Sequence, residues 1–234
     1  FWGSTLHNPE HLPFQVQNIP EVFTQFRQQV EKQSTVASPL PIPQSFPPIP
    51  AIDVGELPNG PSSELSDPSV DSRQMFQFEG GETAGLKRVQ AYIWDCDRLR
   101  HYKDTRNGML QPNDSSKFSP WLALGCLSPR YIDAQVKAYE QERIKNDSTY
   151  WLGFELLWRD YFRYICIKHG KTIFHRSGIR RLNVPWKEDW NLFHLWQAGQ
   201  TGFPLVDANM RELASTGFMS NRGRQIVASF LTKN

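Results

Sequence analysis

Several features that define large classes of protein are missing from this 234-residue sequence. No apolar run reaches the ~18 residues of a membrane-spanning helix, so we expect no membrane partner. The first residues, FWGSTLHNPE, lack the basic and apolar regions of a signal peptide. HExxH, GxGxxG, P-loop and nucleophile-elbow motifs are all absent, so hydrolase and kinase activities have no support.

Cysteine and net charge are both scarce. The three cysteines, Cys96, Cys126 and Cys166, lie far apart without a CxxC pair, and their apolar neighbours predict buried, reduced thiols. We therefore expect neither a disulfide nor a metal site. The net charge of +2 excludes a polycation but permits a local basic groove. Eight tryptophans and 15 phenylalanines are many for this length; some will form the core, and a surplus suits the binding of flat ligands or bases.

The sequence divides into three parts. Residues 1–35 are a lead-in followed by a short amphipathic helix that Ile19-Pro20 is expected to open. Residues 36–79 include nine of the 17 prolines, which predicts an extended or disordered linker without a core. Residues 80–234 show helical periodicity and no β-period segment of useful length, so we predict an all-α domain. The apolar face of the first helix is expected to comprise Phe23, Phe26 and Val30.

Helix signals recur after residue 80. Serine before proline predicts helix starts at Ser119-Pro120 and Ser128-Pro129. Asn146-Asp147-Ser148 is the expected cap of a long helix that runs to His169, and Gly170 is its expected end. Between residues 81 and 102, apolar residues recur at helical spacing and predict a buried stripe: Leu86, Val89, Ile93 and Cys96.

Residues 196–230 predict two helices joined by a tight break. A turn over 199–204 precedes the first helix, and Thr216-Gly217 ends it. The second helix has three polar side chains on one face, because they are spaced i, i+3 and i+4. By periodicity alone, a hairpin with solvated polar residues is the simpler interpretation. The apolar residues of the first helix are Val206, Met210 and Leu213, and the polar residues of the second are Asn221, Arg224 and Gln225.

The literal sequence carries more information than its periodicity. TGFPLVDANMRELASTGFMSNRGRQIVASF closely resembles the most diagnostic segment of the photolyase/cryptochrome family. Together with ELLWRDYF and KFSPWLALGCLSPR it resembles the cryptochrome-DASH branch, strongly from Gly80 onward, fairly over 1–33 and not over about 36–75. The resemblance implies a helical FAD-binding domain of photolyase type, truncated at its C-terminus and lacking an N-terminal antenna domain. The chain would then be a fragment that alone binds FAD weakly or not at all.

A serine-rich loop precedes Pro120. Hydroxyl groups, free N–H groups and the positive end of a helix dipole make such a loop a phosphate site in principle, although most such loops merely cap a helix. In the family that this sequence resembles, the matching loop holds the FAD diphosphate. The resemblance assigns this role to Ser115, Ser116, Lys117 and Ser119, with Tyr102 upstream.

The helix over residues 151–162 is apolar around nearly its whole circumference, so we expect it to be buried. Glu155 and Arg159 are spaced i and i+4 on it, and an internal ion pair between them is one interpretation. The resemblance implies another, in which Arg159 and Leu152 contact FAD and Glu155 faces the cavity between the flavin adenine and a DNA lesion. Glu155 would hydrogen-bond a thymine and supply a proton, and Trp158 would form an apolar wall against a flipped pyrimidine dimer.

The second helix of the hairpin carries the remaining predicted contacts. The resemblance brings Asn221 and Arg224 to the isoalloxazine ring, with Phe218 beside it, and a cation there would stabilise a reduced, anionic flavin. Asn221, Arg222 and Gln225 would also contact DNA. Photolyases that act on duplex DNA typically have Met where Gln225 stands, so Gln225 favours a single-stranded substrate.

Two further features lie between the long helix and the hairpin. Trp186 matches the outermost tryptophan of the family's electron-transfer chain, whose two inner members would lie beyond Asn234, whereas an isolated tryptophan is usually packing. A basic loop with His175-Arg176 and Arg180-Arg181 is either solvated surface or a contact to DNA backbone.

The resemblance implies that the parent protein is a deoxyribodipyrimidine photolyase-like lyase. Its non-covalently bound FAD, once reduced, would absorb blue light and donate an electron to a cyclobutane pyrimidine dimer, preferentially in single-stranded DNA. A folate antenna, 5,10-methenyltetrahydrofolate, belongs to the same expectation. A signalling blue-light photoreceptor without repair is the alternative, and a flavin-free helical nucleic-acid-binding module is the third. A monomer in the cytoplasm is the default.

Overall fold

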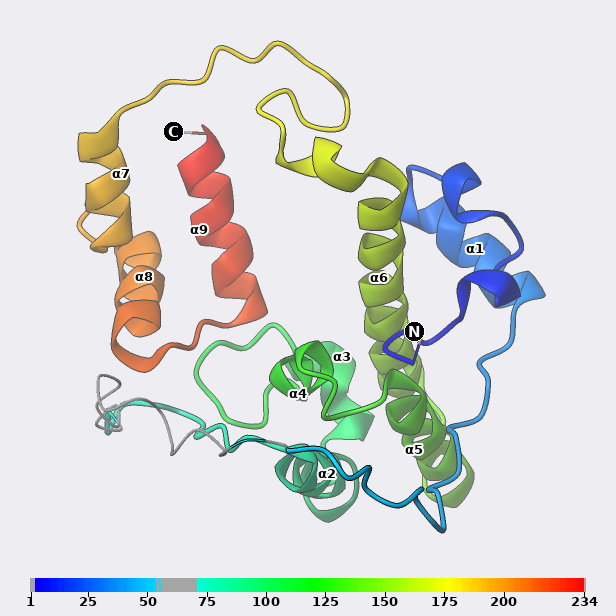
Figure 1. Ribbon diagram of the computed structural model, residues 1–234. Coiled ribbons are helices and arrows are strands. Elements are labelled where there is room, and N and C mark those ends of the chain that lie inside the picture. The colour runs from blue at the N-terminus through cyan, green and yellow to red at the C-terminus, as the bar shows by residue number, and fades with distance from the viewer. Residues whose placement is uncertain (1–2, 54, 56–70, 234) are drawn as a thin grey trace.

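The computed structural model describes residues 3–53, 55 and 71–233. Within these residues the regular structure is entirely helical, which confirms the predicted all-α fold (Figure 1). The part of the proline-rich linker at residues 54 and 56–70 lies outside the described residues. Residues 36–53 form neither helix nor strand and are mostly exposed, as a segment with so many prolines should be.

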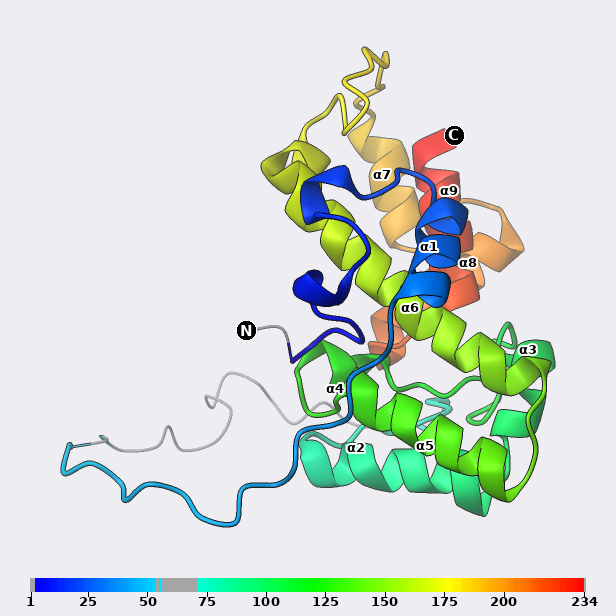
Figure 2. The ribbon, with the colours of Figure 1, turned by 90° about the vertical axis from the view of Figure 1, so that its right-hand side faces the viewer.

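The long helix α6, Asp147–His169, is the element against which α1, α3 and α5 pack (Figures 1 and 2). Its start is a capping box, in which the Asn146 side chain accepts a hydrogen bond from the Thr149 N–H and the Thr149 hydroxyl accepts one from the Asn146 N–H. Gly170 follows its last residue with φ of +52°, a conformation that favours glycine. Both predicted ends of this helix are therefore confirmed.

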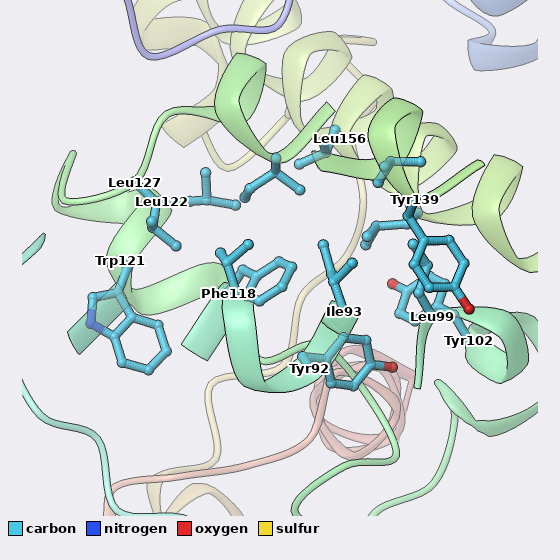
Figure 3. Packing of buried hydrophobic residues seen from close by; sticks show 14 of the residues in the cluster. Tyr92, Ile93, Leu99, Tyr102, Phe118, Trp121, Leu122, Leu127, Tyr139 and Leu156 are labelled. Atoms are coloured by element: carbon cyan, nitrogen blue, oxygen red, sulfur yellow. The ribbon is translucent and has the colours of Figure 1, made fainter. Parts of the chain in front are cut away.

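The main core lies between α6 and the elements that precede it, as Figure 3 shows. Helix α2 (Glu82–Val89) continues directly into a π-helical segment at Gln90–Asp95, and Tyr92 and Ile93 of that segment are fully buried. Further contributions come from α3 (Tyr102–Thr105), α4 (Ser119–Ala123) and α5 (Pro129–Glu142).

The predicted stripe is only half right, and the π-helical segment explains the error at Cys96. Val89 and Ile93 are buried, but Leu86 is 37% exposed and Cys96 is exposed. The Cys96 N–H donates to the Ala91 carbonyl five residues back, so the wider turn rotates Cys96 away from the core. Cys166 is exposed too and Cys126 is only partly buried, so the prediction of buried thiols is wrong.

A second core joins the lead-in to α6. Helix α1 (Phe23–Gln33) begins three residues after Pro20, and its Phe23, Phe26 and Val30 are buried as predicted. They pack against Leu157, Tyr161 and Tyr164 of α6. The lead-in and its helix are therefore part of the folded domain.

The last three helices form a separate group beside the main body (Figure 1). They are α7 (Trp190–Gln197), α8 (Pro204–Thr216) and α9 (Asn221–Lys233). Helix α8 ends at Gly217, which has φ of +69°, and a small core containing Val206, Met210 and Val227 joins α8 to α9. The predicted hairpin and its break are thus confirmed.

Candidate functional site

The serine loop is held rigidly from one side. Four hydrogen bonds from the buried guanidinium of Arg88 on α2 reach acceptors within residues 112–116. Within the described part of the chain, the hydroxyl groups of Ser115, Ser116 and Ser119 make no hydrogen bond to protein. The loop therefore has its carbonyl oxygens satisfied and its hydroxyl groups available.

The second buried cation at this site is Lys117, which belongs to the loop itself. Its backbone is left-handed, with φ of +56°. Its Nζ donates to the Gln111 carbonyl at 3.2 Å and lies 5.3 Å from the Phe218 ring centroid. Burial lowers the pKa of Lys117, and repulsion from Arg88 lowers it further. Neither cation has an ion pair with a described carboxylate. Two buried cations beside available hydroxyl groups fit an anion such as the FAD diphosphate.

The helix that follows this loop contributes less than the sequence suggested. Serine before proline predicted an N-cap at Ser119, but Phe118 is the N-cap and α4 is only five residues long. So short a helix has a weak dipole. The positive potential at the loop comes from Arg88 and Lys117 instead.

Glu155 has a different partner from the one that its spacing suggested. Its carboxylate is paired with Arg106, whose guanidinium lies 4.5 Å from the Trp151 ring centroid. Burial raises the pKa of Glu155, and the attraction of Arg106 opposes this shift. Arg159 donates instead to the carbonyl groups of Ser4 and Leu122. The internal pair between Glu155 and Arg159 is therefore not formed.

The other predicted residues of α6 differ in exposure. Trp158 is half-buried and stacks on Phe23 with ring centroids 3.5 Å apart, and on Phe162 at 5.2 Å. Leu152 and Tyr102 are buried in the main core. Burial also raises the pKa of the Tyr102 hydroxyl. The roles of these residues toward FAD or DNA stay predictions.

A side chain at the start of α9 contacts the loop that follows α3. Arg222 donates to the Gln225 side chain at 2.9 Å and to the Asn107 side chain at 2.8 Å. Asn107 follows Arg106, so two consecutive loop residues connect Glu155 on α6 with Arg222 on α9. Asn221 and Arg224 are exposed. Phe218, just before α9, stacks on Phe78 at 5.7 Å.

Trp186 lies apart from this constellation. Its indole N–H donates to the Arg176 carbonyl at 3.1 Å, and 42% of its surface is exposed. It lines a groove of about 730 Å³ between residues 184–203 and the end of α9, and this groove contains none of the other predicted site residues. In the basic loop, Arg176 pairs with Glu188 while Arg180 and Arg181 are exposed.

Sequence reasoning missed the residues that organise the site. Arg88 directly precedes Val89 of the predicted stripe, and a charged residue beside a buried position was the available signal. Arg106 and Asn107 carried no signal, because their partners lie far away in sequence. The fully buried carboxylate of α6 is Asp160 rather than Glu155, and it accepts hydrogen bonds from the Leu6 and His7 N–H groups.

Comparison with known proteins gives consistent matches. Residues 151–234 match the family described as the FAD binding domain of DNA photolyase. Over all 234 residues the chain is 62% identical to "Cryptochrome DASH" of Gloeobacter violaceus and covers 47% of that protein. The crystal structure of a Synechocystis cryptochrome superposes with a TM-score of 0.95 at 56% identity, over 100% of this chain and 48% of that one.

A more distant solved structure has the same fold. A bacterial class III photolyase from Agrobacterium tumefaciens gives a TM-score of 0.73 at 26% identity, over 99% of this chain and 47% of that one. The chain thus spans about half the length of the curated relatives that it matches. Its sequence and fold are similar to those of photolyase/cryptochrome proteins, and its C-terminal part matches the FAD-binding domain of DNA photolyase. Within the family it resembles the cryptochrome-DASH branch, as its motifs predicted.

Among the described helices, none is long and apolar enough to cross a membrane. The described residues also contain no cluster of His, Cys, Asp and Glu that could hold a metal ion.

Proposed function

We propose that the protein to which this chain belongs binds FAD and uses blue light to repair cyclobutane pyrimidine dimers, preferentially in single-stranded DNA. The observation that supports this most is the bridge from Glu155 through Arg106 and Asn107 to Arg222. It connects the proposed lesion-facing residues of α6 and α9 through two polar contacts made by neighbouring loop residues. The contact between Lys117 and Phe218 links the same helix α9 to the serine loop.

Each part of the proposed site has a distinct task. Ser115, Ser116 and Lys117 bind the FAD diphosphate through hydroxyl groups and one ammonium group. Asn221 and Arg224 orient the flavin ring, beside Phe218. Bound, reduced FAD supplies the electron that opens the dimer when light is absorbed.

Glu155 is the residue that donates a proton to the substrate. Burial raises the pKa of its carboxyl group, and the attraction of Arg106 opposes this shift. The protonated carboxyl can donate a hydrogen bond to a thymine carbonyl, and Trp158 on the next turn of α6 offers an apolar surface to the dimer. In single-stranded DNA the dimer has fewer base-pairing contacts to lose, which agrees with Gln225.

The experiment is Glu155→Ala in the full-length protein. We expect dimer repair in a single-stranded oligonucleotide under blue light to fall by about 100-fold, because a general acid contributes on that order. Flavin absorbance should be retained. Glu142→Ala, at an exposed position near the end of α5, is the matched control. Unchanged repair in Glu155→Ala would contradict the assignment of this residue.

The same experiment separates the alternatives. A signalling photoreceptor would keep the flavin but show no dimer cleavage in the wild-type protein. A flavin-free nucleic-acid-binding module would bind single-stranded DNA with salt-dependent affinity and show no flavin absorbance. We also propose a monomer with a folate antenna in the full-length protein. The cytoplasm is the proposed compartment, although the rice and Arabidopsis relatives are named chloroplastic/mitochondrial.

A further inference from the structure

Arg88 lies outside the predicted site but donates four hydrogen bonds to its serine loop. Its Nε donates to the Ser116 carbonyl at 2.9 Å, and its Nη2 donates to the carbonyls of Pro112 and Ser115 at 3.1 and 3.2 Å. Its Nη1 donates to the Asn113 side chain at 2.9 Å. All four acceptors belong to one five-residue stretch of the serine loop.

The guanidinium is fixed from the other side as well. Its Cζ lies 4.7 Å from the ring centroid of Phe76 and 5.1 Å from that of Tyr92. Only 7% of the Arg88 surface is exposed, and burial lowers the pKa of this guanidinium. A planar, five-donor group between two rings has little freedom, so it fixes the positions of the carbonyl oxygens that it binds.

The direction of these hydrogen bonds determines what the loop presents. Because the backbone carbonyls of Ser115 and Ser116 point to Arg88, their hydroxyl groups are left without a protein partner among the described residues. The buried ammonium of Lys117 follows directly in the chain. An anion in front of the loop would receive hydrogen bonds from the hydroxyl groups and offset the mutual repulsion of the two cations.

We propose that Arg88 is the positioning residue of the diphosphate subsite: it holds three backbone carbonyls and one side chain within residues 112–116 and thereby presents the serine hydroxyls and Lys117 to the ligand. This inference rests on the proposed function, because the ligand is the FAD diphosphate. Arg88 acts through the loop and does not itself touch the cofactor. Lysine cannot replace it, since one ammonium group cannot reach four acceptors spread over five residues.

The test compares Arg88→Lys and Arg88→Met with Lys87→Met in the full-length protein. Lys87 is the neighbouring residue of α2 and is exposed, so its replacement removes the same charge without touching the loop. FAD and riboflavin are titrated by flavin fluorescence. Both Arg88 variants should weaken FAD binding by at least about tenfold, the loss expected for hydrogen bonds to a charged group, and change riboflavin binding by less than about twofold. Riboflavin lacks the diphosphate and serves as the internal reference.

A second readout does not depend on flavin. Amide hydrogen exchange in peptides covering residues 111–118 should become faster in both Arg88 variants and stay unchanged in Lys87→Met. Equal weakening of FAD and riboflavin would overturn the proposal, because it would indicate a general loss of structure. Unchanged exchange in the loop would overturn it too. If the full-length wild-type protein binds neither flavin, the proposed function is contradicted, and the exchange rates still decide whether Arg88 holds the loop.

Discussion

At the scale of single residues, Asp207 shows how one carboxylate can order a turn. It accepts hydrogen bonds from the Thr201 hydroxyl at 2.6 Å, the Thr201 N–H at 2.8 Å and the Gly202 N–H at 3.0 Å. These bonds, the hydroxyl one foremost, lower the pKa of Asp207. The turn that leads into α8 therefore depends on the charge of this residue.

The pH dependence of stability follows from this lowered pKa. A carboxylate with a lowered pKa in the folded state stabilises the protein above its unfolded pKa of about 4, and this stabilisation is lost as the pH falls through the folded pKa. We expect the wild-type unfolding temperature to exceed that of Asp207→Asn at pH 7, and the difference to shrink steadily below pH ~4. Thermal unfolding at several pH values measures this. Asp104→Asn, at an exposed position, should show no such convergence.

At the scale of elements, two glycines in long helices have opposite surroundings. A Cβ on Gly223 of α9 would lie 2.0 Å from Oδ1 of Asn209, a buried side chain on α8. The Asn209 amide is fixed by its hydrogen bond to the Leu205 carbonyl at 2.8 Å, so it cannot move away cheaply. A Cβ on Gly153 of α6 would meet nothing within 4 Å.

These surroundings predict opposite effects of the same substitution. Gly223→Ala should destabilise the protein by about 1–3 kcal/mol, because the added methyl group forces α8 and α9 apart. Gly153→Ala should stabilise it by up to about 1 kcal/mol, because alanine favours the helix and no neighbour is displaced. Denaturant unfolding of both variants gives the free energies. If both substitutions changed the free energy of unfolding in the same direction, the contact between α8 and α9 would not require glycine.

The N-cap of α6 allows a similar test. Asn146→Ala removes the acceptor of the Thr149 N–H and should cost about 1 kcal/mol. Asn146→Ser keeps an acceptor at the helix start and loses only the hydrogen bond from the Asn146 amide to the Arg100 carbonyl, so it should cost less. Denaturant unfolding measures both, and a loss of the same size in the two variants would mean that the cap hydrogen bond is not what matters.

Elements were predictable from sequence where the signal was local. The predicted helix ends at Asn146, Gly170 and Gly217 are confirmed. Capping and a left-handed backbone depend on only a few neighbouring residues, so they can be read from the sequence. The π-helical turn before Cys96 was not predictable, since periodicity assumes a constant helical pitch.

At the scale of the whole molecule, local signals were insufficient. The literal motifs identified the family and the serine loop, but the groups that assemble the site contact one another across long sequence separations. Arg88 reaches residues 112–116, Arg106 reaches Glu155, and Arg222 reaches Asn107. Neither spacing nor composition encodes these contacts, because they depend on how the helices pack.

The longest of these connections joins the N-terminal lead-in to α6. Asp160 is fully buried and accepts hydrogen bonds from the Leu6 N–H at 3.0 Å and the His7 N–H at 2.9 Å. Arg130 of α5 and Tyr164 of α6 donate to carbonyl groups of the same lead-in. The backbone of residues 4–8 is thus held by side chains more than 120 positions away. Asp160 is the acceptor for the N–H groups of Leu6 and His7.

Removal of this carboxylate should therefore affect the whole molecule. Asp160→Ala leaves two buried N–H groups without an acceptor, which should cost about 3 kcal/mol or more and lower the unfolding temperature by on the order of 10 °C. Asp160→Asn keeps one acceptor oxygen, so its stability should lie between those of the wild type and Asp160→Ala. Asp95→Ala, at an exposed position, should leave the stability nearly unchanged. Hydrogen exchange should also rise across residues 4–18 in Asp160→Ala. If the lead-in stayed protected, its apolar contacts with α6 alone would suffice to hold it, and the carboxylate would have no structural role.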